Sequence, residues 1–178
     1  REFDKPFIKS GSSVRLSEYR KGYRYADYIN YNKNLVTDAR KNFPDDYAKL
    51  SDLDVLADIQ HKGGATCLVD FSKNILMALW FACSGDYDKE GVLYCYETIS
   101  DIVGRNNLSV LTMKDSEKPI ERLLVETRKC ANFRGKYSHK FWMWYPSCIN
   151  DRIVRQDSVF IFGLEKFDIN RHGIRKII

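Results

Sequence analysis

The stretch SDLDVLADIQHKGGATCLVDFSKNILMALWFACSG, residues 51–85, says most about the fold of this chain. Ser51 is a typical helix N-cap, and the apolar residues that follow it recur at helical spacing. The glycine pair Gly63–Gly64 is a typical helix end, because glycine adopts the backbone conformation that closes a helix. The spacing therefore predicts a helix over 52–61.

A second helix is expected over 75–83, with Ser72 as its cap and Ser84–Gly85 as its end. Its sequence, ILMALWFAC, is apolar on all sides. A helix without a polar face is normally buried, so this helix is predicted to lie in the core. The two cysteines at its end and just beyond it, Cys83 and Cys95, are expected to be small core residues.

The rest of the chain is helical on one side of this stretch and strand-like on the other. Helices are predicted over 16–30 and 35–42, with Pro44 interrupting, and over 120–129 after Pro119. Strands are predicted where β-branched and aromatic residues gather, at 91–97, 141–145 and 159–164. Helices thus dominate the first half and strands the second, which predicts an α+β fold rather than an alternating α/β fold.

Composition sets the class of protein. The 44% hydrophobic and 30% charged residues are typical of a globular chain, and no linker or repeat divides residues 1–178, so a single domain is expected. The chain begins at Arg1 rather than Met, which suggests a truncated N-terminus. No signal peptide or long apolar run is visible, so a cytoplasmic location and no membrane partner are expected. The five cysteines form no close pair, which argues against a metal site and fits a reducing compartment.

Polar groups gather between the two central helices. Gln60 and His61 close the first helix, Thr66 and Asp70 lie in the connection, and Ser72 opens the second helix. Asp70 follows an apolar pair that should be buried, so its carboxylate is expected to need hydrogen-bond donors. Polar side chains at two facing helix ends, with glycines between them, are typical of a phosphate or ribose pocket.

A structural role for the same residues is the alternative. The carboxylate of Asp70 can accept hydrogen bonds from the start of the following helix, and His61 can satisfy the carbonyl groups of its own helix end. Farther along the chain, an aromatic strand runs into a turn that is followed by Arg152 and Gln156. Arg152 can bind a phosphate or carboxylate with its planar guanidinium group, or it can pair with Asp70 or Asp151 as a structural ion pair.

These two stretches resemble the FRG domain family. The family pattern Gln-His-x-Gly-x-Pro-Thr-Arg-Leu-Leu-Asp-Trp-Thr, followed by a helix ending Ala-Leu-Tyr-Phe-Ala, is matched or conservatively substituted at Gln60, His61, Gly63, Thr66, Leu68, Asp70, Phe71, Ser72 and residues 78–82. A later family segment, Arg-Ile followed by Gln-x-Gly-x-Phe, is matched at Arg152, Ile153, Gln156 and Phe160. The chain departs from the family proline, arginine and glycine at Ala65, Cys67 and Ser158.

The resemblance implies a plan similar to that of ADP-ribosyltransferases, with a helical N-terminal half packed on a mostly antiparallel sheet. By this analogy NAD is the substrate and no metal is needed. The catalytic candidates are His61, Asp70 and Gln156, the last at the position where many transferases place a glutamate. The residues implied in holding NAD are Arg1, Gln60, Thr66, Ser72, Trp80, Phe81 and Arg152.

The resemblance also implies a bacterial or phage-borne toxin or defence effector, with a protein or nucleic-acid target and a neutralising partner. A non-catalytic module that binds nucleic acid or a nucleotide is the alternative. The formal net charge of +5 permits such an anionic partner without requiring one. Hydrolysis by the His61–Asp70 pair is a third reading, since histidine titrates near neutrality and suits acid–base chemistry.

Overall fold

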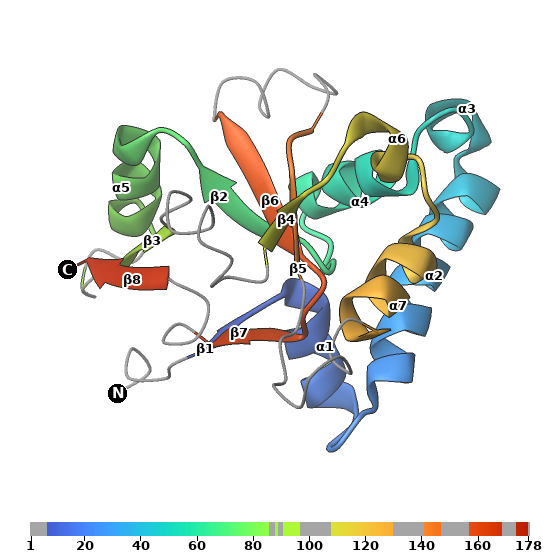
Figure 1. Ribbon diagram of the computed structural model, residues 1–178, viewed down its shortest axis with the longest axis horizontal. Coiled ribbons are helices and arrows are strands. Elements are labelled where there is room, and N and C mark those ends of the chain that lie inside the picture. The colour runs from blue at the N-terminus through green and yellow to red at the C-terminus, as the bar shows by residue number, and fades with distance from the viewer. Residues whose placement is uncertain are drawn as a thin grey trace.

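The computed structural model describes residues 7–85, 88, 91–96, 108–129, 141–146, 157–168 and 174–177 (Figure 1). The described helices are α1 (Gly11–Tyr19), α2 (Tyr25–Asn42), α3 (Pro44–Tyr47), α4 (Asp52–His61), α5 (Ile75–Cys83), α6 (Met113–Ser116) and α7 (Ile120–Lys129). The described strands are β1 (Phe7–Lys9), β2 (Val69–Ser72), β3 (Leu93–Tyr96), β4 (Leu108–Val110), β5 (Phe141–Trp144), β6 (Ser158–Phe162), β7 (Lys166–Asp168) and β8 (Ile174–Ile177).

The central sheet has four strands in the order β2-β6-β5-β4. Strands β2 and β5 both pair with β6 in antiparallel fashion, and only the β4–β5 pair in this sheet is parallel. Two further antiparallel pairs, β1–β7 and β3–β8, lie beside it. The expected α+β class, with its helical N-terminal half and mostly antiparallel sheet, is therefore confirmed.

The sheet separates two apolar clusters. Because side chains alternate along a strand, β5 and β6 place aromatic residues such as Trp144 and Phe160 on one face, where α2, α4 and α7 cover them (Figure 1). The indole nitrogen of Trp142 on this face donates to the carbonyl of Leu123 in α7 at 3.2 Å. The opposite face carries a smaller cluster that includes Phe141, Met143, Val159 and Ile161.

Local signals placed several elements correctly. Helices α4 and α7 have the bounds expected for 52–61 and 120–129, and β5 and β6 lie within two residues of the expected strands. The buried face of α7 consists of Ile120, Leu123, Leu124 and Thr127, which recur at helical spacing. Strand β3 lies inside the expected range 91–97.

The two N-terminal helices are divided elsewhere than expected, so that part of the prediction is wrong, although α2 ends at Asn42 as expected. The chain turns at Gly22, whose φ is +72°, and this turn falls inside the range 16–30 predicted as one helix. A new helix then starts where the Asp27 carboxylate accepts from the Arg24 amide at 2.8 Å. Since no glycine or proline follows before Pro44, α2 runs unbroken through the gap that the sequence suggested at 31–34.

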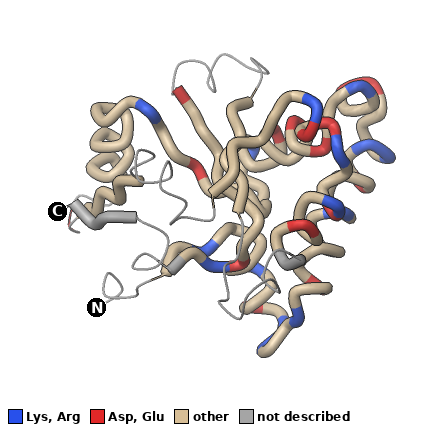
Figure 2. Tube along the Cα trace, in the orientation of Figure 1, with Lys and Arg blue, Asp and Glu red and all other residues tan. Residues whose placement is uncertain are grey.

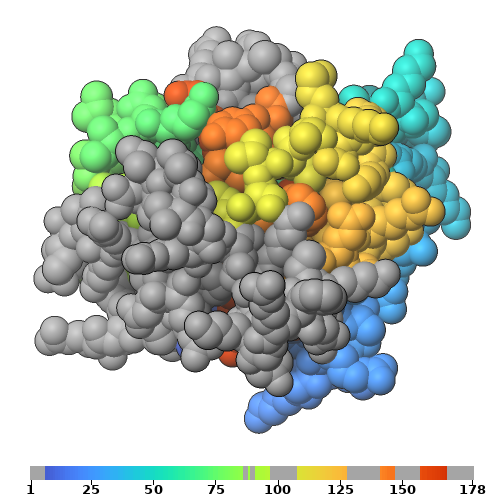
Figure 3. All heavy atoms as spheres, in the orientation of Figure 1, coloured from blue at the N-terminus to red at the C-terminus, as the bar shows by residue number. Residues whose placement is uncertain are grey.

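Helix α5 has the expected bounds, but the prediction that it is buried is wrong. Ile75, Leu76 and Trp80 are 59%, 71% and 60% exposed. The helix packs on one side only, against β2 and β3, at the edge of the sheet rather than over its face. In Figure 3 it lies at the periphery of the molecule. The described part of the chain does not enclose it.

Two smaller expectations around α5, its cap and the burial of two cysteines, also need correction. Asn74, not Ser72, caps the helix, because its side-chain oxygen accepts from the Leu76 amide at 3.0 Å. Cys83 and Cys95 are exposed rather than part of the core. Among the described residues, no helix has both the length and the apolar character needed to cross a membrane.

Candidate functional site

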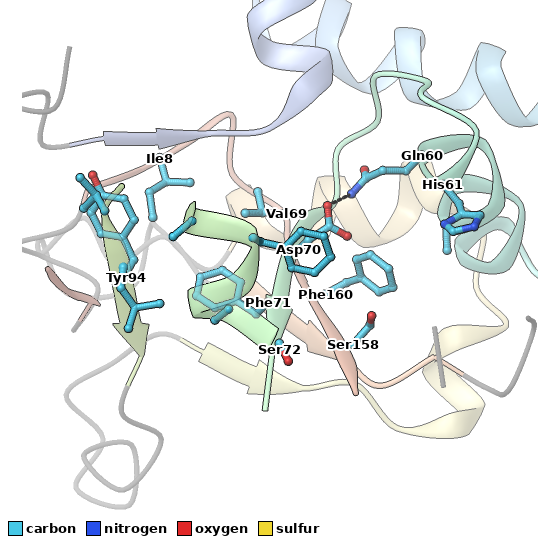
Figure 4. Close-up of a pocket in the computed structure, with 16 residues that line it drawn as sticks. Ile8, Gln60, His61, Val69, Asp70, Phe71, Ser72, Tyr94, Ser158 and Phe160 are labelled. Atoms are coloured by element: carbon cyan, nitrogen blue, oxygen red, sulfur yellow. Dashed lines mark hydrogen bonds between the residues drawn. The ribbon is translucent and has the colours of Figure 1, made fainter. Parts of the chain in front are cut away.

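A cavity of about 480 Å³ lies beside the edge strand β2, between the end of α4, helix α5 and strand β3 (Figure 4). Its polar lining comes from Gln60, His61, Asp70, Ser72 and Ser158. Its aromatic lining comes from Phe71, Phe81, Tyr94 and Phe160. Smaller apolar side chains complete it, namely Ile8, Ala57, Val69, Ala78, Ala82, Val92 and Leu93.

The end of α4 is built by its glycine pair. Gly63 has a φ of +90°, and its amide donates to the carbonyl of Gln60 at 2.9 Å. The amide of Gly64 donates to the carbonyl of Ile59, also at 2.9 Å, so the two bonds satisfy carbonyls that a helix end leaves open. A methyl group on Gly64 would lie only 2.4 Å from Cγ2 of Ile59. The glycines thus fix the helix end that presents Gln60 and His61 to the cavity.

Three hydrogen bonds connect the backbone to the pocket carboxylate. The amide of Leu68 donates to Oγ1 of Thr66 at 3.2 Å, and the Thr66 hydroxyl donates to Oε1 of Gln60. Nε2 of Gln60 then donates to Oδ2 of Asp70 at 2.6 Å, as the dashed line in Figure 4 shows. We call these four residues the Leu68–Asp70 relay.

Helix α1 supports the segment that carries Thr66. The Thr66 side chain is completely buried, and its carbonyl accepts from the amide of Ser12 at 2.9 Å. Gly11 packs so closely that an added Cβ would lie 3.2 Å from Cα of Ala65. The beginning of the relay is therefore held between α1 and the end of α4.

Strand β2 carries the other end of the relay. Asp70 faces Phe160 of β6 across the sheet, and Ser72 faces Ser158 in the same register. The expectation of a buried environment for Asp70 is wrong, because β2 is an edge strand and the carboxylate is exposed within the cavity. The helix start that the structural alternative assigned to Asp70 is capped by Asn74 instead.

Helix α5 supplies only part of its surface to the site. Ala78, Phe81 and Ala82 line the cavity, whereas Trp80 does not. The Trp80 ring packs edge-on against Phe81, with 5.1 Å between ring centroids. Trp80 thus supports a lining residue without belonging to the lining itself.

The structure brings together five of the expected site residues, Gln60, His61, Asp70, Ser72 and Phe81, in the lining of one cavity. It places Thr66 directly behind them, in contact with Gln60. Arg1, Arg152 and Gln156 lie outside the described residues, so their expected roles remain predictions.

Among the polar and aromatic lining residues outside the segment 60–72, sequence reasoning missed three as site residues. Ser158 and Phe160 reach the cavity through the pairing of β2 with β6, and Tyr94 reaches it from β3. Phe160 had a signal, as a match to the later family segment, but nothing in the apolar pattern of that segment pointed to a pocket. The other two required knowledge of which strands are neighbours.

The electrostatic character of the cavity follows from its lining. The described lining residues include no lysine or arginine. Among them, Asp70 supplies a carboxylate. Nowhere in the described ranges do three histidine, cysteine or acidic side chains gather closely enough to hold a metal ion. Cys67, next to the relay, is fully buried, and this burial raises the pKa of its thiol to about 12, so it stays protonated at neutral pH.

Comparison with known proteins bears on the region that contains the cavity. The model of the FRG domain family matches residues 12–91, which include α2 through α5, all of α1 except its first residue, and the whole relay. The later segment that resembles the family, from Arg152 to Phe160, lies beyond the matched range. No curated protein and no solved structure matches the chain. The chain is therefore an FRG-domain protein, with the FRG domain at residues 12–91.

Proposed function

We propose that the cavity binds NAD and that the protein is an enzyme similar to ADP-ribosyltransferases. The observation that carries this proposal is the hydrogen-bonded Gln60–Asp70 pair in a cavity with aromatic walls. The volume of about 480 Å³ lies within the range of small-molecule sites, which are mostly apolar with a few convergent polar groups. Aromatic rings suit a nicotinamide or adenine ring, and a carboxylate suits a ribose.

The proposed reaction is a glycosyl transfer. The bond between the nicotinamide nitrogen and C1′ of the ribose breaks, nicotinamide leaves with the bonding electrons, and the acceptor forms a new bond to C1′ and loses a proton. Positive charge develops on the ribose in the transition state, and a nearby carboxylate such as Asp70 stabilises that charge. His61, at the same cavity, is the proposed base for the acceptor proton.

Gln156 has a limited part in this proposal. It stands where the resemblance places the late glutamate of many transferases, and its amide can orient an acceptor by hydrogen bonding. An amide does not take up a proton at neutral pH, so the proton must go elsewhere. This is why His61 is assigned the base role. Arg1 and Arg152 are the proposed ligands for the phosphates of NAD.

The acceptor, under this proposal, is a protein or a nucleic acid, and the protein acts as a toxin or defence effector with a neutralising partner. The non-catalytic alternative is favoured by the net charge of +5. Figure 2 shows, however, that the described lysine and arginine residues are interspersed with acidic residues along the helices rather than gathered into one basic face. The described cavity lining contains neither basic residue type.

Titration calorimetry with NAD tests the proposal, using the unaltered chain, Asp70→Asn and His61→Ala. Ser17→Ala is the control, since Ser17 is exposed on α1 and bonds only to its own helix backbone in the described contacts. We expect Asp70→Asn to weaken NAD binding about tenfold or more, because a hydrogen bond to a charged group is lost. We expect His61→Ala to retain binding but to slow the release of nicotinamide.

The contrary result is equally clear. If the folded, unaltered chain gives no heat with NAD and releases no nicotinamide, the transferase proposal fails. RNA binding that weakens steeply with added salt would then support the nucleic-acid module, since release of counterions from phosphate contacts produces that dependence.

A further inference from the structure

The Leu68–Asp70 relay has a fixed direction. A backbone amide such as that of Leu68 can only donate, so one lone pair of the Thr66 hydroxyl is occupied by it. At the other end an ionised carboxylate can only accept, so Gln60 must turn its NH₂ group toward Asp70. The Gln60 carbonyl then faces Thr66, whose single hydroxyl proton goes to it.

Rotating the Gln60 side-chain amide by half a turn would exchange its NH₂ group and its carbonyl oxygen and remove the hydrogen bond to Asp70. Its carbonyl oxygen would face an oxygen of Asp70, and a hydrogen bond would form there only if the carboxyl group were protonated. An exposed aspartate is ionised near neutral pH, so the reversed arrangement sets two acceptors against each other. The carboxylate of Asp70 therefore sets the orientation of Gln60, and the buried hydroxyl of Thr66 supports it by donating to the Gln60 carbonyl.

We infer that Thr66 and Gln60 are positioning residues that hold Asp70 as a hydrogen-bond acceptor for the ribose of a nucleoside bound in the cavity. This inference rests on the proposed function and names the part of the ligand that Asp70 contacts. Because Asp70 accepts, the ligand group that meets it must donate, as the hydroxyls of a ribose do. A carboxamide on the base is a second source of the same donor chemistry.

The described lining disfavours a phosphate at the same place. A phosphate offers acceptor oxygens and negative charge, and both are unfavourable beside the carboxylate of Asp70. The aromatic rings of Phe71, Phe81 and Tyr94 complete a cavity that suits the neutral or cationic end of a dinucleotide.

The relay is tested first in the free protein, by NMR of the Gln60 side-chain amide. Thr66→Ser keeps the hydroxyl, whereas Thr66→Val replaces it with a methyl group of similar size. The Gln60 amide is assigned as the glutamine signal that disappears in Gln60→Met, since the chain contains one other glutamine, Gln156. We expect one slowly exchanging, shifted amide proton in the unaltered chain and in Thr66→Ser, and loss of that signature in Thr66→Val. Thr37→Val, at an exposed hydroxyl of α2, is the matched control.

The ligand is tested by calorimetry with three probes: nicotinamide riboside, its 2′-deoxy analogue and nicotinic acid riboside. We expect the unaltered chain and Thr66→Ser to bind the riboside about tenfold more tightly than the deoxy analogue, because a charged acceptor loses its donor. Asp70→Asn and Gln60→Met should reduce that ratio toward one. Gln60→Met leaves the buried Thr66 in place, so it tests the relay even if Thr66→Val folds poorly.

Each result decides something definite. A ratio that stays near tenfold in Gln60→Met or Asp70→Asn overturns the inference. A ratio near one in the unaltered chain, together with rejection of nicotinic acid riboside, shows that the donor is the carboxamide and overturns the ribose assignment. Riboside binding without binding or cleavage of NAD defeats the proposed function but supports the inference. If no probe binds, the ribose assignment fails, and the amide signal still decides whether Thr66 supports the orientation of Gln60.

Discussion

The exposure of helix α5 leads to a prediction that separates the structure from the pattern of the sequence. A nine-residue helix of composition ILMALWFAC reads as a core helix, yet Leu76 is 71% exposed. Full burial of a leucine stabilises a fold by roughly 1.5–3 kcal/mol, and less than a third of this side chain is covered. Leu76→Ala should therefore lower the free energy of unfolding by only about 0.5 kcal/mol, since alanine also has the higher helix propensity.

Leu56→Ala in α4 is the matched control. Leu56 is completely buried in the larger apolar cluster, so the same truncation should cost about 2–5 kcal/mol through lost burial and the cavity left behind. Urea denaturation followed by circular dichroism measures both variants. NAD binding should be unaffected in Leu76→Ala, because α5 contributes Ala78, Phe81 and Ala82 to the cavity rather than Leu76.

A loss above about 2 kcal/mol for Leu76→Ala would refute this reasoning, because it would show that the leucine is packed in solution. Repeating the denaturation at several protein concentrations separates the causes of such a result. A loss that grows with concentration would indicate that the helix is covered by self-association. A loss independent of concentration would mean that the fold itself buries α5.

Three other perturbations follow from particular contacts. Gly64→Ala should destabilise the chain by roughly 1–3 kcal/mol in urea, because its methyl group would lie 2.4 Å from a side-chain carbon of α4; an unchanged midpoint would contradict the tight helix end. Burial of Asp58 acts to raise its pKa, but hydrogen bonds from Lys62 and a tyrosine outweigh this and lower it from 3.8. Its contribution to stability is thus present at neutral pH and lost as the pH falls through the lowered pKa, so Asp58→Asn should cost stability near pH 7 and little near about pH 2, as urea titrations would show. Alkylation with peptide mapping near neutral pH should leave Cys67 unmodified, since burial raises the pKa of its thiol to about 12, and should modify the exposed Cys83 and Cys95; early labelling of the buried thiol would contradict its environment.

The sequence predicted well what is decided locally. Ser51, Pro119 and the pair Gly63–Gly64 act on neighbouring backbone groups through capping, a fixed φ and a left-handed turn. Each effect is complete within one turn of helix, so the bounds of α4 and α7 follow from it. The end of α1 shows the limit, because the chain leaves the helix at Arg20, whose backbone is extended, and turns at Gly22, inside the range predicted as one helix.

Exposure was predicted poorly because it is decided by tertiary contacts. The apolar composition of α5 says that burial would be favourable, but not that a neighbour covers the helix. Asp70 was misplaced for the same reason: the apolar pair before it suggested a buried strand, whereas β2 lies at the edge of the sheet. Whether a strand is central or at an edge depends on pairing with β6, about ninety residues later in the chain.

The candidate site also has one part that local sequence could predict and one part that depends on tertiary contacts. Its polar wall, from Gln60 to Ser72, is one continuous segment, because a helix that ends at a glycine pair and a strand that begins a few residues later must lie close together. The sequence could therefore assemble most of that wall, although the contact between Gln60 and Asp70 was found only in the structure. The aromatic wall needs Tyr94 and Phe160 from separate strands, which only the folded sheet brings to the cavity. Tyr94→Ala, which leaves residues 60–72 unchanged, should consequently keep the Leu68–Asp70 relay while removing one ring of the aromatic wall.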